Sequence, residues 1–201
     1  MRHRAAASDT VTSGGIMTDK LKILGFSGSL RADSYNTAAL RAVREVAPED
    51  VQIEIYDISG FPPFNQDQDS SPPQVVSDLK AAIKAADAII FSSPEYNYSV
   101  PGHLKNVIDW ASRPYGDSAW DGKPALIMGA SIGPIATARM QYHLRQIMVF
   151  LNMHPLNKPE VMIGTAQDKF DASGKLTDDT TREFLRQAIA ALAHWTRRLR
   201  S

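Results

Sequence analysis

Polar side chains that could bind an anion cluster in one short segment near the start of the chain, Ser27 to Asn36, which reads SGSLRADSYN. An apolar run precedes this segment, and the residues after it have the apolar spacing of a helix, so we expect the cluster at a helix N-terminus. Such a terminus presents free backbone N–H groups, and the arginine adds a permanent positive charge. The segment therefore predicts a site for one terminal phosphate.

The glycine patterns of two other phosphate sites are absent from this segment. It contains neither GxGxxG, which is typical of dinucleotide sites, nor GxxxxGK[ST], which is typical of nucleoside triphosphate sites. A purely structural role is the alternative, with Ser34 as the helix cap and Arg31 as a solvated side chain. The clustering of polar groups directly after a strand favours the phosphate site. The candidate residues are Ser27, Ser29, Leu30, Arg31, Ser34, Tyr35 and Asn36.

A second segment combines aromatic, amide and proline residues after another apolar run, Ala88 to Ser92. Its candidate residues are Pro94, Glu95, Tyr96, Asn97 and Tyr98. Flat rings on a stiff turn with spare main-chain polar groups suit an aromatic heterocycle, which can stack on tyrosine. An ordinary proline-bounded turn with surface tyrosines is the alternative.

Short apolar runs alternate with segments of helical spacing along the rest of the chain. The predicted strands cover residues 21–27, 51–56, 88–92, 125–130 and about 160–163, and the predicted helices cover 34–47, about 76–83, 104–111, 140–151 and 178–199. Continuously apolar strands that alternate with helices indicate a parallel sheet with helices on both faces. This pattern predicts an α/β three-layer sandwich of the flavodoxin-like type, with a five-stranded sheet of order 2-1-3-4-5. In that order the loops after Ser27, Ser92 and Ala130 meet at the ligand-binding edge.

The composition is that of an ordinary globular protein. The chain has 201 residues, and we expect one domain over residues 21–201 after a small, polar and disordered tail at residues 1–20. No apolar run reaches the roughly 18 residues that a membrane-spanning helix needs. Lys and Arg number 22 and balance 22 Asp and Glu, which argues against nucleic-acid or membrane partners.

Cysteine and histidine usage limits the chemistry further. The chain has no cysteine, which excludes disulfides, thiolate catalysis and cysteine metal sites, and which fits a cytoplasmic location. The 5 histidines are scattered without metal-ligand spacing, so we expect no metal site.

Three stretches carry a recognisable pattern. They are GSLRADSYN at residues 28–36, SPEYNYSVPGHLKNVIDWASRP at 93–114, and ARMQYHLRQIMVFLN at 138–152, with NKPE at 157–160. Together they resemble the NADPH-dependent FMN reductase family over about residues 21–195. These are flavodoxin-like flavoproteins whose members include quinone, chromate and azo-compound reductases.

The resemblance implies a bound FMN, with its phosphate in the segment 27–36 and its isoalloxazine ring against residues 94–98. It also implies a further flavin contact from Ser131 and a co-substrate that is NADPH or NADH. Family members often have a Gly-Gly pair before the arginine that matches Arg139, whereas this chain has Gly-Pro-Ile-Ala-Thr-Ala at 133–138. The resemblance therefore does not fix the path of that loop.

A flavin supplies its own redox chemistry, so no side chain is expected to act as catalytic acid, base or nucleophile. The expected function is an FMN-dependent NAD(P)H oxidoreductase with ping-pong kinetics, which passes hydride from NADPH to FMN and reduces quinones or similar small-molecule electron acceptors. The alternative is a flavodoxin-type electron carrier that binds FMN without oxidising NADPH itself, and a non-catalytic interaction module on the same fold is a third possibility. Carriers are usually strongly acidic, so the net charge of +0 favours the reductase.

Apolar side chains beyond the predicted core indicate self-association. On the fourth predicted helix, Tyr142, Val149 and Phe150 fall off the apolar stripe, and the loop segment from Phe61 to Phe64 adds apolar surface near the expected flavin edge. A contiguous exposed apolar area of that kind usually marks an association surface. We therefore expect a homodimer or a homotetramer.

Overall fold

The computed structural model describes residues 20–200, so the predicted tail at residues 1–20 lies outside the described residues apart from Lys20. The elements in chain order are β1 Leu21–Ser27, α1 Tyr35–Glu45, β2 Val51–Tyr56, η1 Gln66–Gln68, α2 Gln74–Ala85, β3 Ala88–Ser92, α3 Gly102–Ala111, β4 Pro124–Ala130, α4 Ala138–Phe150, β5 His154–Pro155, β6 Val161–Ile163, η2 Ala166–Asp168 and α5 Asp179–Arg200. The predicted helices are confirmed, with ends that differ by a residue or two. Within residues 20–200, no helix is long and apolar enough to cross a membrane.

The strands form one sheet in the order β2-β1-β3-β4, and the short strands β5 and β6 both pair with β4. All of these pairings are parallel, which confirms the predicted order 2-1-3-4-5. The prediction of a single last strand near residues 160–163 was incomplete, because two separate segments fill the fifth position. Pro159, which lies between those segments, has no backbone N–H to donate to β4.

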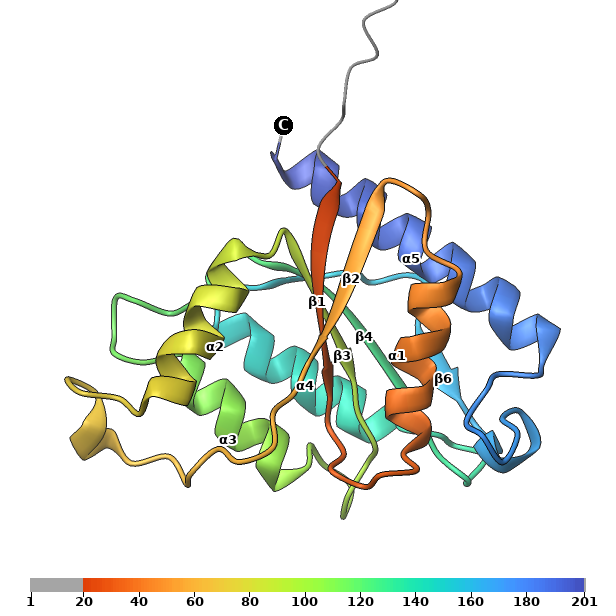
Figure 1. The fold of residues 1–201 in the computed structure, drawn as a ribbon, viewed down its shortest axis with the longest axis horizontal. Helices are drawn as coiled ribbons and strands as arrows, with labels where there is room; N and C mark the ends of the chain where they lie inside the picture. Colours follow the sequence, from red (N-terminus) through yellow and green to blue (C-terminus); the bar gives the residue numbers. More distant parts are fainter. Residues whose placement is uncertain (1–19, 201) are drawn as a thin grey trace, which may run out of the picture.

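Helices α1 and α5 cover one face of the sheet, and α2, α3 and α4 cover the other (Figure 1). Each face buries its own apolar core. In the core under α3 and α4, the rings of Phe26, Phe91 and Trp120 pack with centroids 5.6 to 5.7 Å apart. The indole N–H of Trp120 donates to the Ile108 carbonyl at 3.0 Å, so this large ring is buried with its polar group paired.

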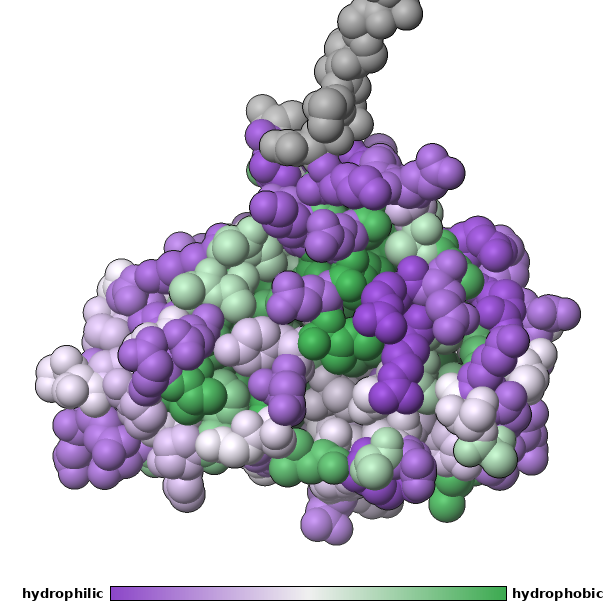
Figure 2. All heavy atoms as spheres, in the orientation of Figure 1, coloured by the Kyte–Doolittle hydropathy of each residue, from purple (hydrophilic) through white to green (hydrophobic). Residues whose placement is uncertain are grey.

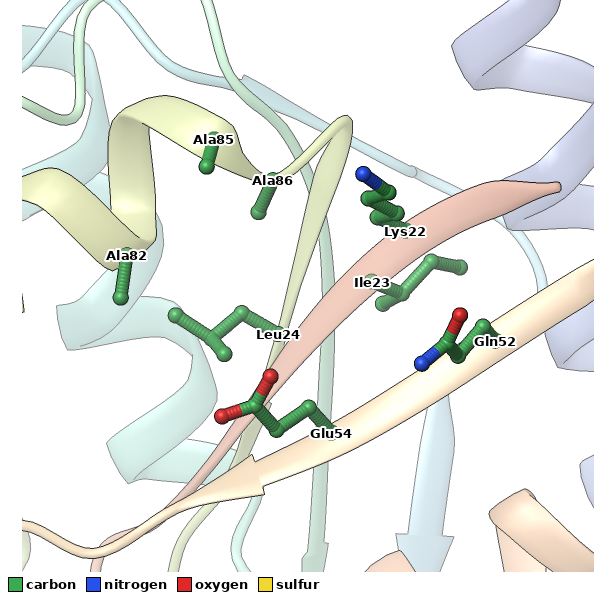
Figure 3. Close-up of a pocket in the computed structure, with 8 residues that line it drawn as sticks. All are labelled: Lys22, Ile23, Leu24, Gln52, Glu54, Ala82, Ala85 and Ala86. Carbon is green, nitrogen blue, oxygen red and sulfur yellow. The ribbon is translucent and has the colours of Figure 1, made fainter. Parts of the chain in front are cut away.

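A small hollow of about 120 Å³ opens where β1 and β2 meet the end of α2 (Figure 3). Apolar atoms show between hydrophilic side chains on this face of the molecule (Figure 2). Lys22, Gln52 and Glu54 form the polar side of the hollow, and Leu24 lies on its apolar side. These residues lie along the strands rather than at the carboxyl ends, where ligands bind in this fold.

The outer face of α4 carries exposed apolar side chains, as their spacing predicts. Tyr142, Val149 and Phe150 have exposed fractions of 58%, 81% and 76%. The corresponding prediction for the loop after β2 was wrong, because Phe61 is buried and Phe64 packs edge-on against a tryptophan of α3 with ring centroids 5.1 Å apart. Phe61 and Phe64 fold back onto their own domain, so of the two predicted apolar surfaces the structure supports the one on α4.

Asn36, in the first turn of α1, joins the ends of two strands. Its side-chain N–H donates to the Ala130 carbonyl at 3.0 Å, and its side-chain oxygen accepts the Ala130 N–H at 2.8 Å. The Ser92 hydroxyl donates to the Asn36 carbonyl at 2.9 Å. Asn36 is only 3% exposed, so these bonds are shielded from water and hold α1 against the carboxyl ends of β3 and β4.

Replacing Asn36 with alanine would leave the Ala130 N–H and carbonyl buried without partners. We expect the free energy of unfolding of the ligand-free protein to fall by about 2 to 5 kcal/mol, because each orphaned buried group costs roughly 1 to 3 kcal/mol. Urea unfolding followed by circular dichroism measures this loss. The control is Asn157→Ala, whose exposed side chain should contribute less than about 0.5 kcal/mol. Equal losses in the two variants would contradict the role of Asn36.

Candidate functional site

Three loops meet where β1, β3 and β4 end, at the lower edge of the sheet in Figure 1. Ser27 is in register with Ser92, and the Gly28 N–H donates to the Ser92 carbonyl at 2.8 Å. A Cβ atom on Gly28 would lie 2.2 Å from the Ser93 hydroxyl oxygen, so glycine lets the first two loops approach this closely. The prediction that the loops after Ser27, Ser92 and Ala130 lie together is confirmed.

The predicted phosphate segment forms the loop between β1 and α1. Ser34 is the N-cap of α1, and its hydroxyl accepts the N–H groups of Asn36 and Thr37 at 3.2 and 3.4 Å. The Thr37 hydroxyl donates to the Ser27 hydroxyl at 2.8 Å. The side chains of Ser34 and Asn36 are thus engaged inside the protein, where they position the loop and leave other groups to face a ligand.

The remaining groups of this loop are available to an anion. Within residues 20–200, the backbone N–H groups of Leu30, Ala32 and Asp33 donate to no oxygen of the protein. Arg31 is exposed, and its guanidinium carbon lies 5.5 Å from the centre of the Tyr35 ring. The first turn of α1 has no acidic residue, so the helix dipole and the arginine place positive charge together. This set of donors fits a single phosphate group.

The second predicted segment forms a tight hairpin turn. Tyr96 and Ser99 exchange backbone hydrogen bonds of 3.1 and 3.0 Å, with Asn97 and Tyr98 between them. Both central residues have positive φ angles, 49° and 68°, which is the backbone of a turn that usually carries Asn and Gly. A tyrosine in this conformation is strained. The rings of Tyr96 and Tyr98 are exposed, so the turn presents two flat surfaces at the edge of the sheet.

Glu95 precedes this turn, and its carboxylate is directed into the protein. The side chain is 7% exposed and forms an ion pair with Arg139, with 2.5 Å between Glu95 Oε1 and Arg139 Nε. Its other oxygen accepts the backbone N–H groups of Arg139 and Met140 at 3.0 and 3.2 Å. The N-cap residue of α4, Thr137, makes no side-chain cap, so Glu95 supplies the anionic cap of that helix.

Helix α4 holds the hairpin turn at two further points. The guanidinium of Arg139 lies over the Tyr98 ring, 3.8 Å from its centre. One helical turn later, His143 Nδ1 lies 2.9 Å from the Ser99 hydroxyl oxygen. Together with the Glu95 cap, these contacts hold the turn in its strained shape.

Ser131 begins the loop after β4, and three hydrogen bonds hold it in place. Its N–H donates to the Ile163 carbonyl at 2.9 Å, and its carbonyl accepts the Ala166 N–H at 3.0 Å. Its hydroxyl accepts the Gly133 N–H at 3.2 Å. The next side chain, Ile132, is 68% exposed, so this loop adds an apolar side chain at the same sheet edge as the polar loop before α1.

Sequence reasoning did not identify the contacts that Thr37, Arg139 and His143 make around the site. Thr37 reaches Ser27 from the adjoining helix, whereas Arg139 and His143 lie 44 residues from their partners in the hairpin turn. The four-residue spacing of Arg139 and His143 places them on one helix face, and this is the signal that could have linked them.

The most strongly shifted acidic group lies away from this edge. Lys80 and Lys84 donate to the Asp117 carboxylate at 2.7 and 2.5 Å, and these bonds lower its pKa to about 2. Asp117 lies between α3 and β4, at the opposite end of the sheet. Within the part of the chain that the structure describes, no three His, Cys, Asp or Glu side chains gather as a metal-ligand set. The groups at the candidate site are hydrogen-bond donors, an arginine and aromatic rings.

Similarity to known proteins covers most of the chain. An NAD(P)H-dependent FMN reductase of Pseudomonas aeruginosa is 55% identical over 185 residues, which are 92% of this chain and 100% of the relative. A 2-hydroxy-1,4-benzoquinone reductase of a Burkholderia species is 42% identical over 177 residues, 88% of this chain and 97% of the relative. Among solved structures, the flavoenzyme NAD(P)H:(acceptor) oxidoreductase FerB of Paracoccus denitrificans has a TM-score of 0.82 and 34% identity, covering 89% of this chain and 98% of that chain.

A family model adds to these individual similarities. The model for NADPH-dependent FMN reductase matches residues 21–168. That range includes the loop before α1, the hairpin turn after β3 and Ser131 after β4, so it contains the whole candidate site. The chain therefore belongs to the NADPH-dependent FMN reductase family.

Proposed function

We propose that this chain is an FMN-dependent NAD(P)H oxidoreductase that reduces quinones or similar small electron acceptors by a ping-pong mechanism. The observation that carries the proposal is that a loop with unpaired N–H groups and Arg31 lies at the same sheet edge as the exposed rings of Tyr96 and Tyr98. FMN, when bound, supplies the chemistry, because its ring accepts hydride from a nicotinamide and passes two electrons to a second substrate. The protein then has to bind, orient and shield the reacting groups.

The loop before α1 is the proposed site of the FMN phosphate. Arg31 and the free N–H of Leu30 would donate to the phosphate oxygens, and the Ser29 hydroxyl lies in the same loop. Ser27, Ser34, Tyr35 and Asn36 complete the proposed set. Among these, Ser34 and Asn36 act by holding the loop, because their side chains already bond within the protein.

Residues 94–98 and Ser131 are the proposed neighbours of the flavin ring. Tyr96, Asn97 and Tyr98 are exposed and face outward at the edge of the sheet. Glu95 acts at a distance, because its carboxylate caps α4 and pairs with Arg139. The rigid turn would leave one side of the ring open to alternating nicotinamide and acceptor.

Quinones are the proposed acceptors because several similar proteins are named for them. Besides the Burkholderia relative, a quinone reductase of Escherichia coli is 40% identical over 188 residues, 92% of this chain and 100% of the relative. A quinone is flat, and the exposed tyrosine rings suit it. The formal net charge of +0 disfavours an electron carrier that docks on a basic partner protein.

Anaerobic reduction tests this function directly. NADPH added without oxygen to the FMN-loaded protein should bleach the flavin absorbance, and a quinone should restore it. Steady-state rates with both substrates varied should give parallel lines in double-reciprocal plots, as a ping-pong mechanism requires. Reduction that occurs only when a second reductase protein is added would replace this proposal with the electron-carrier alternative.

Removing the arginine of the phosphate loop tests the binding mode. Arg31→Ala should weaken FMN by about 1.5 to 3 kcal/mol, the contribution of a charge-assisted hydrogen bond, and should leave riboflavin nearly unaffected. Quenching of flavin fluorescence measures both affinities, and riboflavin serves as the control because it lacks the phosphate. Equal weakening of the two ligands would contradict the assignment of this loop.

We also propose that the working unit is a homodimer or homotetramer in the cytoplasm, without nucleic-acid or membrane partners. The exposed apolar side chains of Tyr142, Val149 and Phe150 on α4 support association. The balanced charge supports the absence of polyanionic partners, and the lack of cysteine fits a reducing compartment.

Light scattering of the FMN-bound protein at micromolar concentration should give two or four times the chain mass of 22.1 kDa. Phe150→Glu should shift the mass toward the monomer, because a charge would be buried in an apolar contact. The control is Phe184→Glu, which changes an exposed aromatic residue of α5 and should leave the mass unchanged. A wild-type mass of one chain would show that this surface does not associate.

A further inference from the structure

We propose that the pocket between the start of α1 and the loop at residues 169–177 binds the phosphorylated adenosine end of NADPH, and that Arg41 selects NADPH over NADH by pairing with the 2′-phosphate. This inference rests on the proposed function, since it assigns the part of the co-substrate beyond the nicotinamide. NADPH differs from NADH by that phosphate alone. A cation placed here would therefore decide between the two co-substrates.

The pocket has a volume of about 190 Å³ and adjoins the phosphate loop. Arg31, Tyr35 and Arg41 line it on one side, and Asp171 and Ser173 line it on the other. Because Arg31 belongs both to this lining and to the phosphate loop, a ligand in the pocket is a direct neighbour of the phosphate proposed for FMN. A co-substrate that must reach the flavin can be held here by its other end.

The turn that forms the far wall is ordered by its own hydrogen bonds. Asp171 accepts the backbone N–H groups of Ser173 and Lys175 at 2.9 and 3.0 Å, and it accepts the Ser173 hydroxyl at 2.6 Å. These bonds hold the pKa of the Asp171 carboxyl below its usual value. Asp171 therefore stays ionised, with its carboxylate engaged by donors of its own turn.

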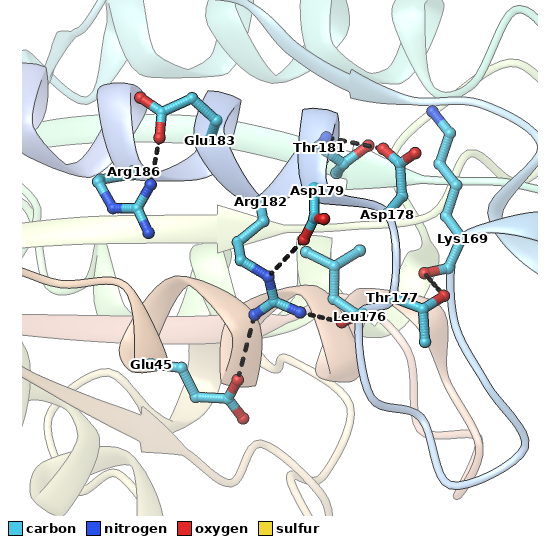
Figure 4. Close-up of polar contacts among 10 residues, drawn as sticks. All are labelled: Glu45, Lys169, Leu176, Thr177, Asp178, Asp179, Thr181, Arg182, Glu183 and Arg186. Atoms are coloured by element: carbon cyan, nitrogen blue, oxygen red, sulfur yellow. Dashed lines mark hydrogen bonds and ion pairs between the residues drawn. The ribbon is translucent and has the colours of Figure 1, made fainter.

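Helix α5 fastens this wall to the rest of the domain (Figure 4). Arg182 donates to the Leu176 carbonyl, and its guanidinium also lies 3.8 Å from the carboxylate of Glu45 at the end of α1. The Thr177 hydroxyl donates to the Lys169 carbonyl at 3.1 Å. Arg182 thus connects the loop that carries the far wall to α1, the helix whose first turns form the other wall.

The Arg41 guanidinium lines the pocket and has no partner among the described residues. Arg41 is exposed, and within residues 20–200 it forms no ion pair or hydrogen bond through its side chain. Asp33 is the second acidic residue in the lining, and it too is exposed. A guanidinium without a carboxylate partner, beside a loop that already suits phosphate, matches the bidentate recognition of a phosphate monoester.

The floor of the pocket suits the less polar part of an adenosine. The Tyr35 ring is half-buried and packs against Phe170 with ring centroids 5.7 Å apart. Ala38, on the next turn of α1, also lines the pocket and contributes only a methyl group. A flat ring and a small side chain leave room for a sugar or a base beside the arginines.

Binding of 2′,5′-ADP, which carries the 2′-phosphate but no nicotinamide, tests the pocket without any reaction. Calorimetry on the FMN-loaded protein should show that 2′,5′-ADP binds more tightly than 5′-AMP. Arg41→Ala should weaken 2′,5′-ADP about tenfold or more and leave 5′-AMP within about twofold. The matched control is Arg44→Ala, an exposed arginine of the same helix outside the pocket, which should leave both affinities unchanged.

Steady-state kinetics on the same variants should agree. Arg41→Ala should raise KM for NADPH about tenfold, with kcat and the KM for NADH within about twofold. No binding of 2′,5′-ADP to the wild type, or equal effects of Arg41→Ala and Arg44→Ala, would overturn the pocket assignment. FMN content and anaerobic reduction by NADH are measured on the same preparations, so a failure of the proposed function itself is recognised separately.

Discussion

The pair of hydrogen bonds between the Asn36 side chain and the Ala130 backbone sets the distance between the parts of the site. An amide side chain has a donor and an acceptor side by side, so it can satisfy a strand end as a neighbouring strand would. Through this pair, α1 and the loop before it are fixed to β4, and the Ser92 hydroxyl adds β3. Asn36 thus adds a buried connection to the direct hydrogen bond from the Gly28 N–H to the Ser92 carbonyl.

Helix α4, on the other face of the sheet, fixes the hairpin turn in a similar way. Its first N–H groups need an anionic partner, and Glu95 meets that need from the hairpin turn. The strained backbone at Asn97 and Tyr98 is kept because the turn is fixed at both ends and at its ring. Buried side chains thus fix the site, while the N–H groups of the first loop, the Tyr96 ring and the exposed part of the Tyr98 ring remain available for binding.

Much of the fold, and the position of the two main loops, can be predicted from local sequence patterns. Continuous apolar runs predict the strands, and the polar clusters directly after Ser27 and Ser92 predict the two main loops. The two loops are expected to meet because the carboxyl ends of parallel strands lie at the same edge of the sheet. Local patterns do not show which polar residue bonds across the fold. Asn36 pairs with a residue 94 positions away, and Glu95 with one 44 positions away, so the sequence predicts both as ligand contacts and does not show their partners inside the protein. The burial of Phe61 was missed for the same reason, since Phe61 belongs to a core cluster that includes side chains of α2, α3 and α4.

The close approach of Gly28 to Ser93 makes the backbone positions of two loops depend on each other. Any side chain at position 28 would occupy the space that the Ser93 hydroxyl and Cβ now fill, 2.2 and 2.7 Å from the added carbon. Removing the Ser93 side chain would not clear this space, because the backbone Cα of Ser93 would still lie 3.1 Å from a Cβ atom at position 28. A side chain at position 28 therefore requires the backbones of the loop before α1 and the loop after β3 to move apart.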